Sequence, residues 1–428
     1  MTDQADVTDQ AERLQCVIAG GGPAGMMAGL LLARAGVRVL VLEKHGDFLR
    51  DFRGDTVHPS TLTLLDELGL AGEFTELRQR RTRVLTVVTD DGEYPLADFG
   101  RLPIRHPYLA FVPQWDLLDL LARHARTLRA FQLRMRAEVV GVLRDGGRVT
   151  GVRYQDQDGT RTVRSDLVLG ADGRDSAVRR AAGLEPVDFG APMDVLWFRI
   201  SRHPTDPDSA FGRLARGRLL VLIDRGEHWQ VGYVIPKGSA QTLRAEGIES
   251  FRRSLAELAP FLAGRVGELT GWDAVKPLTV QVNRLRRWWR PGLLCIGDAA
   301  HAMSPVGGVG INLAIQDAVA TARMLAVPLR SGPVPPGRLA AVQRRRTAPT
   351  VLTQAAQRGV QRWFLGQVVA GKAGGATPGA LRLLDRVPIL QTVPAYLVGI
   401  GVLPEHVPPG LRGLYPEGRT RSRRAGGE

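Results

Sequence analysis

The chain has 428 residues, 44% hydrophobic and 23% charged, which suits a globular protein of two or three packed units. Its net charge of +14 comes mainly from arginines spread along the whole chain without interleaved aromatic residues, so we expect no nucleic-acid partner. The acidic N-terminal residues predict no signal peptide, and the absence of an apolar run of eighteen residues predicts no membrane span. The two cysteines lack the spacing of a metal site or a disulfide, and these features together favour the cytoplasm.

The stretch 14–43 has the pattern of a strand, a glycine-rich turn, a helix and a second strand. Residues 16–19 are continuously apolar, as in a strand buried on both faces. The turn from Gly20 to Gly25 fits the pattern G-x-G-x-x-G, and residues 26–35 have a helix-forming composition. Residues 37–42 form the second apolar run, which ends at Glu43. This order predicts a βαβ unit.

Each position of this motif has a physical role in binding a dinucleotide. Gly20 allows the tight turn, Gly22 lets the backbone approach a pyrophosphate, and Gly25 lets the helix pack closely on the strand. The start of the helix offers free N–H groups and a partial positive charge to phosphates. Glu43 can accept hydrogen bonds from both ribose hydroxyls of an adenosine. We therefore predict a dinucleotide site; the alternative is an ordinary glycine-rich turn in a parallel sheet.

The rest of the chain alternates between two sequence patterns, one of helices with fully buried strands and one of alternating apolar strands. Helices are expected at 61–68 and 114–127, followed by a β-meander with strands at 138–142, 149–154 and 162–164. A buried strand at 166–169 then leads into a glycine turn and a short basic helix at 174–182. From about residue 186 the pattern becomes antiparallel, with strands at 195–200, 219–224, 229–235 and 278–285 and one helix at 248–262. The first pattern then returns, with a buried strand at 292–296, a glycine-rich loop at 307–310 and a helix at 311–324.

These patterns predict an α/β fold of several units. We assign 14–185 and 284–328 to two parts of a nucleotide-binding domain and 186–283 to a β-sheet domain for the substrate. Residues 329–415 are expected to form a helical C-terminal region, and 1–13 and 416–428 to be disordered tails.

Three motifs stand in the order of one known family. Gly20–Gly25 with Glu43, then Asp172-Gly173 with Arg179, then Gly297-Asp298 resemble the fingerprints of the single-component FAD-dependent aromatic monooxygenases. The type fold of that family is para-hydroxybenzoate hydroxylase, and the resemblance covers roughly residues 14–325. It implies a Rossmann-like FAD-binding domain of the glutathione-reductase type, an antiparallel substrate domain and a helical C-terminal region.

The resemblance also implies roles for single residues. Glu43 would bind the adenosine ribose and Asp298 the ribityl chain of FAD. Arg53 and Gln114 look like the arginine and glutamine of the family that contact the FAD phosphates and ribityl chain. Asp172-Gly173 resembles a motif implicated in binding both FAD and a nicotinamide cofactor. The other expected cofactor contacts are Pro23, Ala24, Lys44, Pro305, Gly308, Gly310, Ile311 and Asn312.

The residues of the third motif support the same interpretation. Small residues at 307–310 permit close backbone approach to a flat ring, and a helix that starts at Ile311 can direct N–H groups at the N1–C2=O edge of a flavin. That arrangement would stabilise the anionic reduced flavin. The alternatives are that Asp298 is a helix N-cap and that Asp172-Gly173 is a plain turn.

The reaction implied by the family uses NADPH or NADH and O2. The nicotinamide cofactor binds transiently and reduces the flavin, and a flavin C4a-hydroperoxide then oxygenates an electron-rich carbon of an aromatic or polyketide-like small molecule. We expect a monomer or homodimer without firm membrane association, because Pro388 and Pro394 interrupt the apolar stretch 387–403 and favour a packed C-terminal region.

The substrate side gives weaker signals. Trp197, Arg199, Trp229 and Tyr233 lie on predicted strands, where aromatic residues are more often core than pocket. His301 follows Asp298 closely, which is consistent with a place near the flavin and equally with helix capping or packing. His58 and His106 lie in loops next to prolines, and neither has a partner that the sequence identifies. No catalytic base can be assigned.

Three other functions stay open. An FAD-dependent reductase of the geranylgeranyl-reductase type would carry the same motifs. A flavin-dependent halogenase is disfavoured, because the segment from Trp229 to Pro236 lacks the second tryptophan of W-x-W-x-I-P and the basic segment 78–83 contains no lysine. A protein that holds flavin or a drug-like ligand without turnover is the third.

Overall fold

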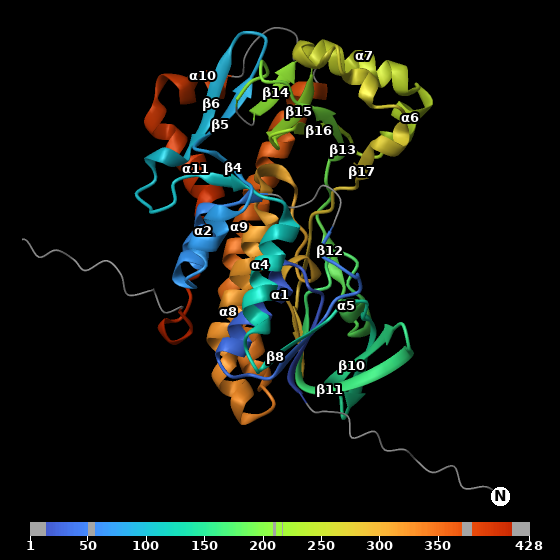
Figure 1. Ribbon diagram of the computed structural model, residues 1–428, viewed down its shortest axis with the longest axis vertical. Coiled ribbons are helices and arrows are strands. Elements are labelled where there is room, and N and C mark those ends of the chain that lie inside the picture. Colours follow the sequence, from blue (N-terminus) through green and yellow to red (C-terminus); the bar gives the residue numbers. More distant parts are fainter. Residues whose placement is uncertain (1–13, 50–55, 209–210, 216, 370–378, 413–428) are drawn as a thin grey trace, which may run out of the picture.

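The computed structural model describes residues 14–49, 56–208, 211–215, 217–369 and 379–412, and contains two large sheets (Figure 1). The first lies in the lower half of the view beside a set of long helices, and the second lies at the top beneath α7 (Ile248–Leu258). Arg53 and the predicted tails lie outside the described residues.

The first sheet has a parallel centre. β1 pairs in parallel with β2 and with β11, and β11 continues in parallel to β20. Their apolar runs are buried on both faces, as expected for a parallel sheet between layers. The strands, in spatial order, are β19 (Trp289–Arg290), β20 (Leu293–Cys295), β11 (Gly159–Gly170), β1 (Leu14–Ala19), β2 (Val39–Leu42) and β8 (Phe131–Arg134), with β10 (Arg148–Asp156) and β9 (Glu138–Asp145) extending β11.

Long helices cover one side of this sheet. α1 (Pro23–Arg34) packs on α8 (Gly310–Ser331) and on α4 (Gln114–Arg126), and α8 packs on α9 (Pro336–Val369) (Figure 1). The meander β9–β10 and α5 (Ala177–Ala181) lie on the other side in that view. One hydrophobic core joins both layers.

The second sheet has seven strands and is mostly antiparallel. α7 covers one face, where Phe251, Leu255 and Leu258 are buried against the strands. The other face is turned away from α7. The strands, in spatial order, are β17 (Lys276–Leu278), β13 (Met193–Ser201), β16 (His228–Pro236), β15 (Arg218–Asp224), β14 (Phe211–Ala215), β5 (Val84–Val88) and β6 (Glu93–Asp98).

Smaller elements complete the chain. A three-stranded sheet has the order β3 (Thr56–Val57), β7 (Leu109–Phe111) and β4 (Arg80–Thr82), and β12 (Pro186–Asp188) pairs with β18 (Asn283–Leu285). The remaining helices are α2 (Pro59–Glu67), α3 (Ala71–Glu76), α6 (Ala240–Ala245), α10 (Gly379–Arg386) and α11 (Thr392–Gly399), with short 3-10 turns η1 (Phe99–Arg101), η2 (Pro260–Leu262), η3 (Val266–Glu268), η4 (Trp272–Ala274), η5 (Gly297–Ala299), η6 (Val306–Gly308), η7 (Pro388–Gln391) and η8 (Pro409–Leu411).

The α/β fold with a helical C-terminal region is confirmed, but several details differ from the expectations. The strands expected at 162–164 and 166–169 form one strand, β11, because its second half enters the parallel sheet while its first half stays in the meander. The strand expected at 278–285 is interrupted and forms β17 and β18, which pair in different sheets. β5 and β6 lie within 14–185, yet they belong to the second sheet, where β5 pairs with β14 and β6 pairs with β5.

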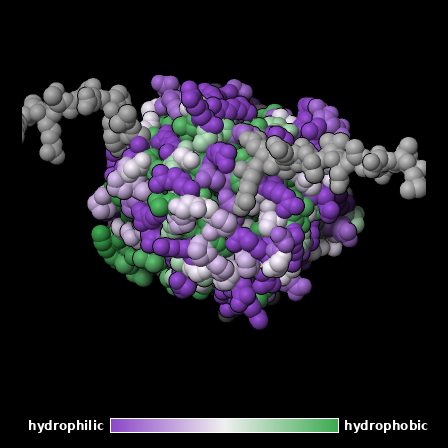
Figure 2. Space-filling model, turned by 90° about the horizontal axis from the view of Figure 1, so that it is seen from below, coloured by the Kyte–Doolittle hydropathy of each residue, from purple (hydrophilic) through white to green (hydrophobic). Residues whose placement is uncertain are grey.

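The surface seen from below is mainly hydrophilic, with green hydrophobic side chains gathered at the left margin (Figure 2). Within the described ranges, no helix is both long enough and apolar enough to cross a membrane. The stretch 387–403 is less packed than expected, because Ile389 is 65% exposed, Val393 58% and Leu403 62%.

Candidate functional site

The three glycines of the first motif have different surroundings. Gly20 has a φ of +97°, and a Cβ there would lie 2.4 Å from the carbonyl oxygen of Ala171. A Cβ on Gly25 would lie 1.9 Å from the carbonyl oxygen of Gly20. Both glycines are therefore required by the fold itself. Around Gly22, in contrast, no described atom beyond its chain neighbours lies within 4 Å of such a Cβ, so space is open for a ligand.

The start of α1 is available to an anion. Gly22 is its N-cap residue, Pro23 follows in the first turn, and no described side chain caps the helix. Glu43 closes the end of β2 beside this turn: its Oε2 accepts a hydrogen bond from the N–H of Gly21 at 2.8 Å and its Oε1 one from the N–H of His45 at 3.1 Å. The carboxylate is thus fixed at the edge where a ribose would approach, whereas Lys44 is exposed beyond it.

The second motif builds the start of α5. Asp172 Oδ1 accepts from the hydroxyl of Ser176 at 2.5 Å, and Oδ2 accepts from the N–H of Val178 at 3.0 Å. Burial raises the pKa of Asp172, while these hydrogen bonds oppose the rise. Gly173 has a φ of +82°, which favours glycine. Asp172 therefore holds the loop in place through α5.

Arg179 links the second motif to the third. Its guanidinium donates to the carbonyl oxygen of Arg174 at 2.6 Å and to that of Ala299 at 3.2 Å. Arg174 in turn pairs with Asp298, with Nε and Oδ2 3.2 Å apart. Asp298 is thus a partly exposed carboxylate next to an arginine, and no helix N-cap interaction is formed by its side chain at η5.

The motifs converge at one edge of the first sheet. A Cβ on Gly20 would lie 2.8 Å from Cα of Asp172, which places the first motif against the second. A Cβ on Gly297 would lie 3.1 Å from Cβ of Ala24 and 3.3 Å from Cβ of Ala314, which places the third motif between α1 and α8. Carboxyl ends of parallel strands meet at such an edge, where ligands bind in open α/β sheets.

The glycine loop ahead of α8 packs against the segment around β3. Gly307 and Gly308 both have positive φ, +76° and +64°. A Cβ on Gly308 would lie 3.2 Å from Cβ of Thr56 and 3.4 Å from Nε2 of His58. At the start of α8, Asn312 accepts a short hydrogen bond from the hydroxyl of Thr61 on α2. The other predicted contacts lie at the ends of helical elements. Pro305 precedes η6, Gly310 and Ile311 lie in the first turn of α8, and Gln114 lies in the first turn of α4.

Sequence reasoning missed a row of buried glutamines on α9. Gln354 donates to the carbonyl oxygens of Asn283 and Ala302, at 2.9 and 3.1 Å. Gln357 donates to those of Ser304 and Val306, at 2.9 and 2.8 Å. Gln361 donates to the hydroxyl of Ser304 at 2.5 Å. The spacing i, i+3, i+7 places all three on one face of the helix, and this spacing was the signal available in the sequence.

The row fixes the loop that connects η5 to α8. The carbonyl group of Ser304 is buried and that of Val306 is partly buried, and carbonyls shielded from water require donors. The conformation of the predicted flavin loop therefore depends on a helix about fifty residues further along the chain.

A second buried network holds the third motif from behind. Asp317 on α8 accepts from the N–H of Gly297 at 3.0 Å and contacts His301 at 2.6 Å and Arg346 at 2.9 Å. Arg346 is also 3.6 Å from Glu405. The pKa of Asp317 is lowered: burial alone would raise it, but the charges and hydrogen bonds of His301 and Arg346 outweigh burial. His301 is therefore engaged in structure, which accounts for its place in the motif.

His58 and His106 have different surroundings. His58 is fully buried beside the glycine loop, and its Nδ1 donates to the carbonyl oxygen of Val398 at 2.8 Å. Burial lowers its pKa to about 4, so it is neutral at pH 7. His106 lies against Asp66 of α2, with Nε2 and Oδ2 3.9 Å apart.

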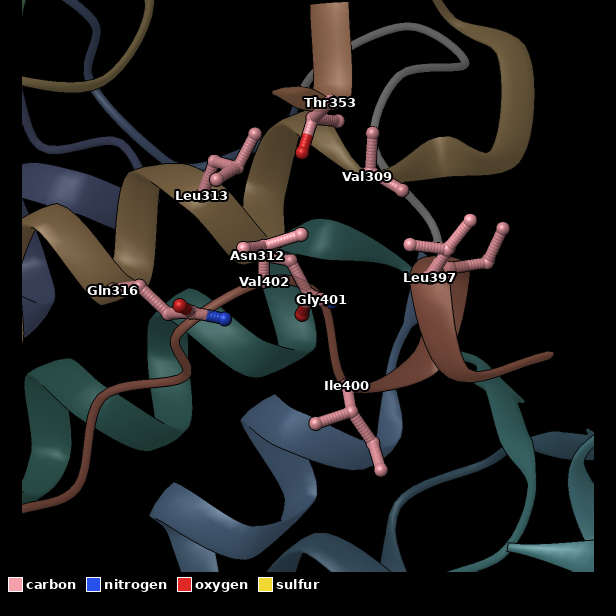
Figure 3. Close-up of a pocket in the computed structure, with 10 residues that line it drawn as sticks. Val309, Asn312, Leu313, Gln316, Thr353, Leu397, Ile400, Gly401 and Val402 are labelled. Carbon is pink, nitrogen blue, oxygen red and sulfur yellow. The ribbon is translucent and has the colours of Figure 1, made fainter. Parts of the chain in front are cut away.

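The C-terminal region packs next to the glycine loop ahead of α8. A pocket lies between the start of α8 and the end of α11 with the residues that follow it; Val309, Asn312 and Gln316 line one side, and Leu397 and Gly401 the other (Figure 3). A Cβ on Gly307 would lie 3.6 Å from Cγ2 of Val398. Residues 397–402 therefore enclose the glycine loop from outside.

The four substrate-side candidates lie on opposite faces of the second sheet. Trp229 and Tyr233 are buried in the core beneath α7. Trp197 and Arg199 belong to the other face, because neighbouring residues of β13 alternate and Phe198 joins the core under α7. Trp197 packs there against a small cluster of Phe111, Ile223 and Val221.

Comparison with known proteins agrees with the three motifs. The family model described as FAD binding domain matches residues 13–356. The chain is 34% identical to 6-methylpretetramide 4-monooxygenase of Streptomyces rimosus over 390 residues, which cover 90% of this chain and 92% of that protein. Digeranylgeranylglycerophospholipid reductase 1 of Methanopyrus kandleri is 26% identical over 310 residues, 70% of this chain and 76% of its own.

Among solved structures, the OxyS anhydrotetracycline hydroxylase of Streptomyces rimosus is similar with a TM-score of 0.70 and 26% identity, covering 92% of this chain and 77% of that chain. The chain therefore belongs to the FAD binding domain family. Within that family it is an FAD-dependent monooxygenase, with the fold expected for the para-hydroxybenzoate hydroxylase group.

Proposed function

We propose that this enzyme uses NADPH or NADH and O2 to add one oxygen atom to an aromatic or polyketide-like small molecule. The observation that carries the proposal is the convergence of the three motifs at one sheet edge, joined with the similarity to 6-methylpretetramide 4-monooxygenase along nearly the whole chain. The substrate class follows that relative's name.

The described residues suit FAD as the resident cofactor. The open space at Gly22 and the uncapped start of α1 would hold the pyrophosphate, and Glu43 would hold the adenosine ribose. Asp298 would bind the ribityl chain, and the N–H groups at the start of α8 would face the isoalloxazine. When bound, FAD supplies the electron transfer and oxygen activation.

The nicotinamide cofactor would bind near an unusual pair of cations. Arg284 and Arg358 both lie over the ring of Phe189, at 5.0 and 4.9 Å from its centroid. Neither forms an ion pair with a carboxylate in the part of the chain that the structure describes. Burial, and then the charge of Arg358, lower the pKa of Arg284. Two close cations without a counter-ion suit a pyrophosphate, and Arg284 is held by Gln354, which also binds Ala302 in the third motif.

The protein groups contribute positioning and electrostatics. Arg174 pairs with the Asp298 carboxylate and fixes its direction, and the N-terminal end of α8 favours negative charge at its first turn. His58 stays neutral at pH 7 because it is buried, so its ring brings no positive charge to the glycine loop beside it.

The test uses purified FAD-loaded protein, NADPH or NADH, and a panel of phenols, quinones and polycyclic aromatics. The proposal expects one ligand to accelerate oxidation of the nicotinamide cofactor, with matching O2 uptake and a product heavier by one oxygen atom. A reduced product without oxygen incorporation would favour a reductase, and ligand binding without turnover a binding protein. Arg284→Gln should raise the KM for the nicotinamide cofactor about tenfold with little change in kcat, whereas the exposed Arg286→Gln should change neither.

A further inference from the structure

The face of the second sheet turned away from α7 has an unusual composition. One row across four strands consists of Trp197, Gly232, Val221 and Gly212, which are direct cross-strand partners. Glycine inside a strand weakens a sheet and often marks close approach of a ligand or of another backbone. At Gly232 the indole of Trp197 lies over the backbone, because a Cβ there would be 3.0 Å from two of its ring carbons. At Gly212 a Cβ would make ordinary contacts, the nearest at 3.6 Å from Cδ1 of Leu219, so this glycine is not crowded by its neighbours.

Trp197 carries a polar group that the fold does not use. Its indole Nε1 is shielded from solvent and has no hydrogen-bond partner among the described residues. A buried N–H without an acceptor costs roughly 1–3 kcal/mol, so such groups call for an explanation. By contrast, the indole of Trp229 on the opposite face donates to Asp206 at 2.8 Å.

This face is adjacent to the glycine loop. Trp197 packs against Phe111 and Ile223. Phe111 is the cross-strand partner of Thr56, and Thr56 contacts the Cβ position of Gly308. Three contacts thus lead from the orphan N–H to the loop predicted to hold the flavin ring.

On the sheet already expected to hold the substrate, we infer that Trp197 is a specificity-determining residue, whose N–H donates a hydrogen bond to a carbonyl or phenolic oxygen of a flat, fused-ring aromatic molecule. This inference rests on the proposed function and narrows its substrate class. The apolar surface of Val221 and Ile223 would pack on the rings. The oxygen atom would satisfy the N–H, and an analogue without that oxygen would leave it unpaired.

The experiment measures equilibrium binding to the oxidised holoenzyme, without NADPH or NADH, by calorimetry and by the absorbance change of the flavin. The probes are xanthone and xanthene, which share a three-ring frame and differ at the carbonyl. Trp197→Phe should weaken binding of xanthone about tenfold and change binding of xanthene less than about twofold. Tyr233→Phe, on the opposite face, is the matched control and should change neither.

Equal weakening of both probes by Trp197→Phe would reduce the residue to a packing role and overturn the inference. The same holds if neither probe responds to the substitution, or if wild-type holoenzyme does not bind xanthone. Because no turnover is measured, failure here is distinct from failure of the monooxygenase proposal, which O2 uptake and product mass decide.

Discussion

Replacing Gln357 by leucine tests whether α9 sets the conformation of the flavin loop. The substitution keeps the size of the side chain but removes the two hydrogen bonds to the carbonyl oxygens of Ser304 and Val306. A net hydrogen bond contributes about 1 kcal/mol, and a buried carbonyl left without a donor costs roughly 1–3 kcal/mol. The expected loss in the free energy of unfolding is therefore about 2–4 kcal/mol.

The same change should weaken FAD binding, because the loop at Ser304 leads directly into η6 and the start of α8. A loop that must be ordered again on binding reduces affinity, and each 1.4 kcal/mol corresponds to a factor of about ten in Kd. We expect the Kd for FAD to rise at least tenfold. The assays are urea unfolding of the apoprotein and titration of the apoprotein with FAD by flavin fluorescence.

The matched control is Gln391→Leu. Gln391 is also buried and donates to a carbonyl oxygen, that of Leu384, but it is the last residue of η7 and does not contact the loop at Ser304. It should lose about 1 kcal/mol of stability and keep its affinity for FAD. If Gln357→Leu lost stability while binding FAD as tightly as wild type, the glutamine row would be a structural feature only and the reasoning would be refuted.

Three further predictions concern single residues. Gly25→Ala should prevent stable folding, because its Cβ would meet the carbonyl of Gly20. Gly22→Ala should keep a wild-type melting temperature and lose affinity for FAD. Thermal unfolding and FAD titration distinguish the two effects. Burial lowers the pKa of His58 from 6.5 to about 4, so the unfolded chain binds a proton at this residue first as the pH falls. The contribution of His58 to the free energy of unfolding is therefore complete above pH 6.5, and roughly 3 kcal/mol is lost between pH 6.5 and 4. By urea unfolding, His58→Gln should lose less stability than wild type between pH 7 and pH 5, and an equal loss would contradict the assignment. Burial raises the pKa of both Cys16 and Cys295, so a thiol reagent at pH 8 should label neither in the folded protein and both in urea, and rapid labelling of the native state would show that these strands open.

Local pattern determined much of this protein. The spacing of Gly20, Gly25 and Glu43 requires a tight turn, a close helix and an acid at a strand end, and these constraints lie within thirty residues of one another. Periodicity likewise separated the parallel, fully buried strands from the alternating strands of the second sheet. The linked motifs were enough to indicate the family and its cofactor.

Only the tertiary structure decided which residues act together across long distances in the sequence. The side chain of Gln357 reaches Ser304, and Glu405 approaches Arg346, because α9 and the C-terminal segment pack on α8. Likewise, the pairing of β13, β16 and β15 put Trp197 on one face and Trp229 on the other, although both are tryptophans on similar strands. Sequence composition shows which side chains can donate, accept or pack, but the partners of a buried polar group are set by the way elements pack together. Among the described residues, that packing leaves the indole N–H groups of Trp197 and Trp288 without an acceptor.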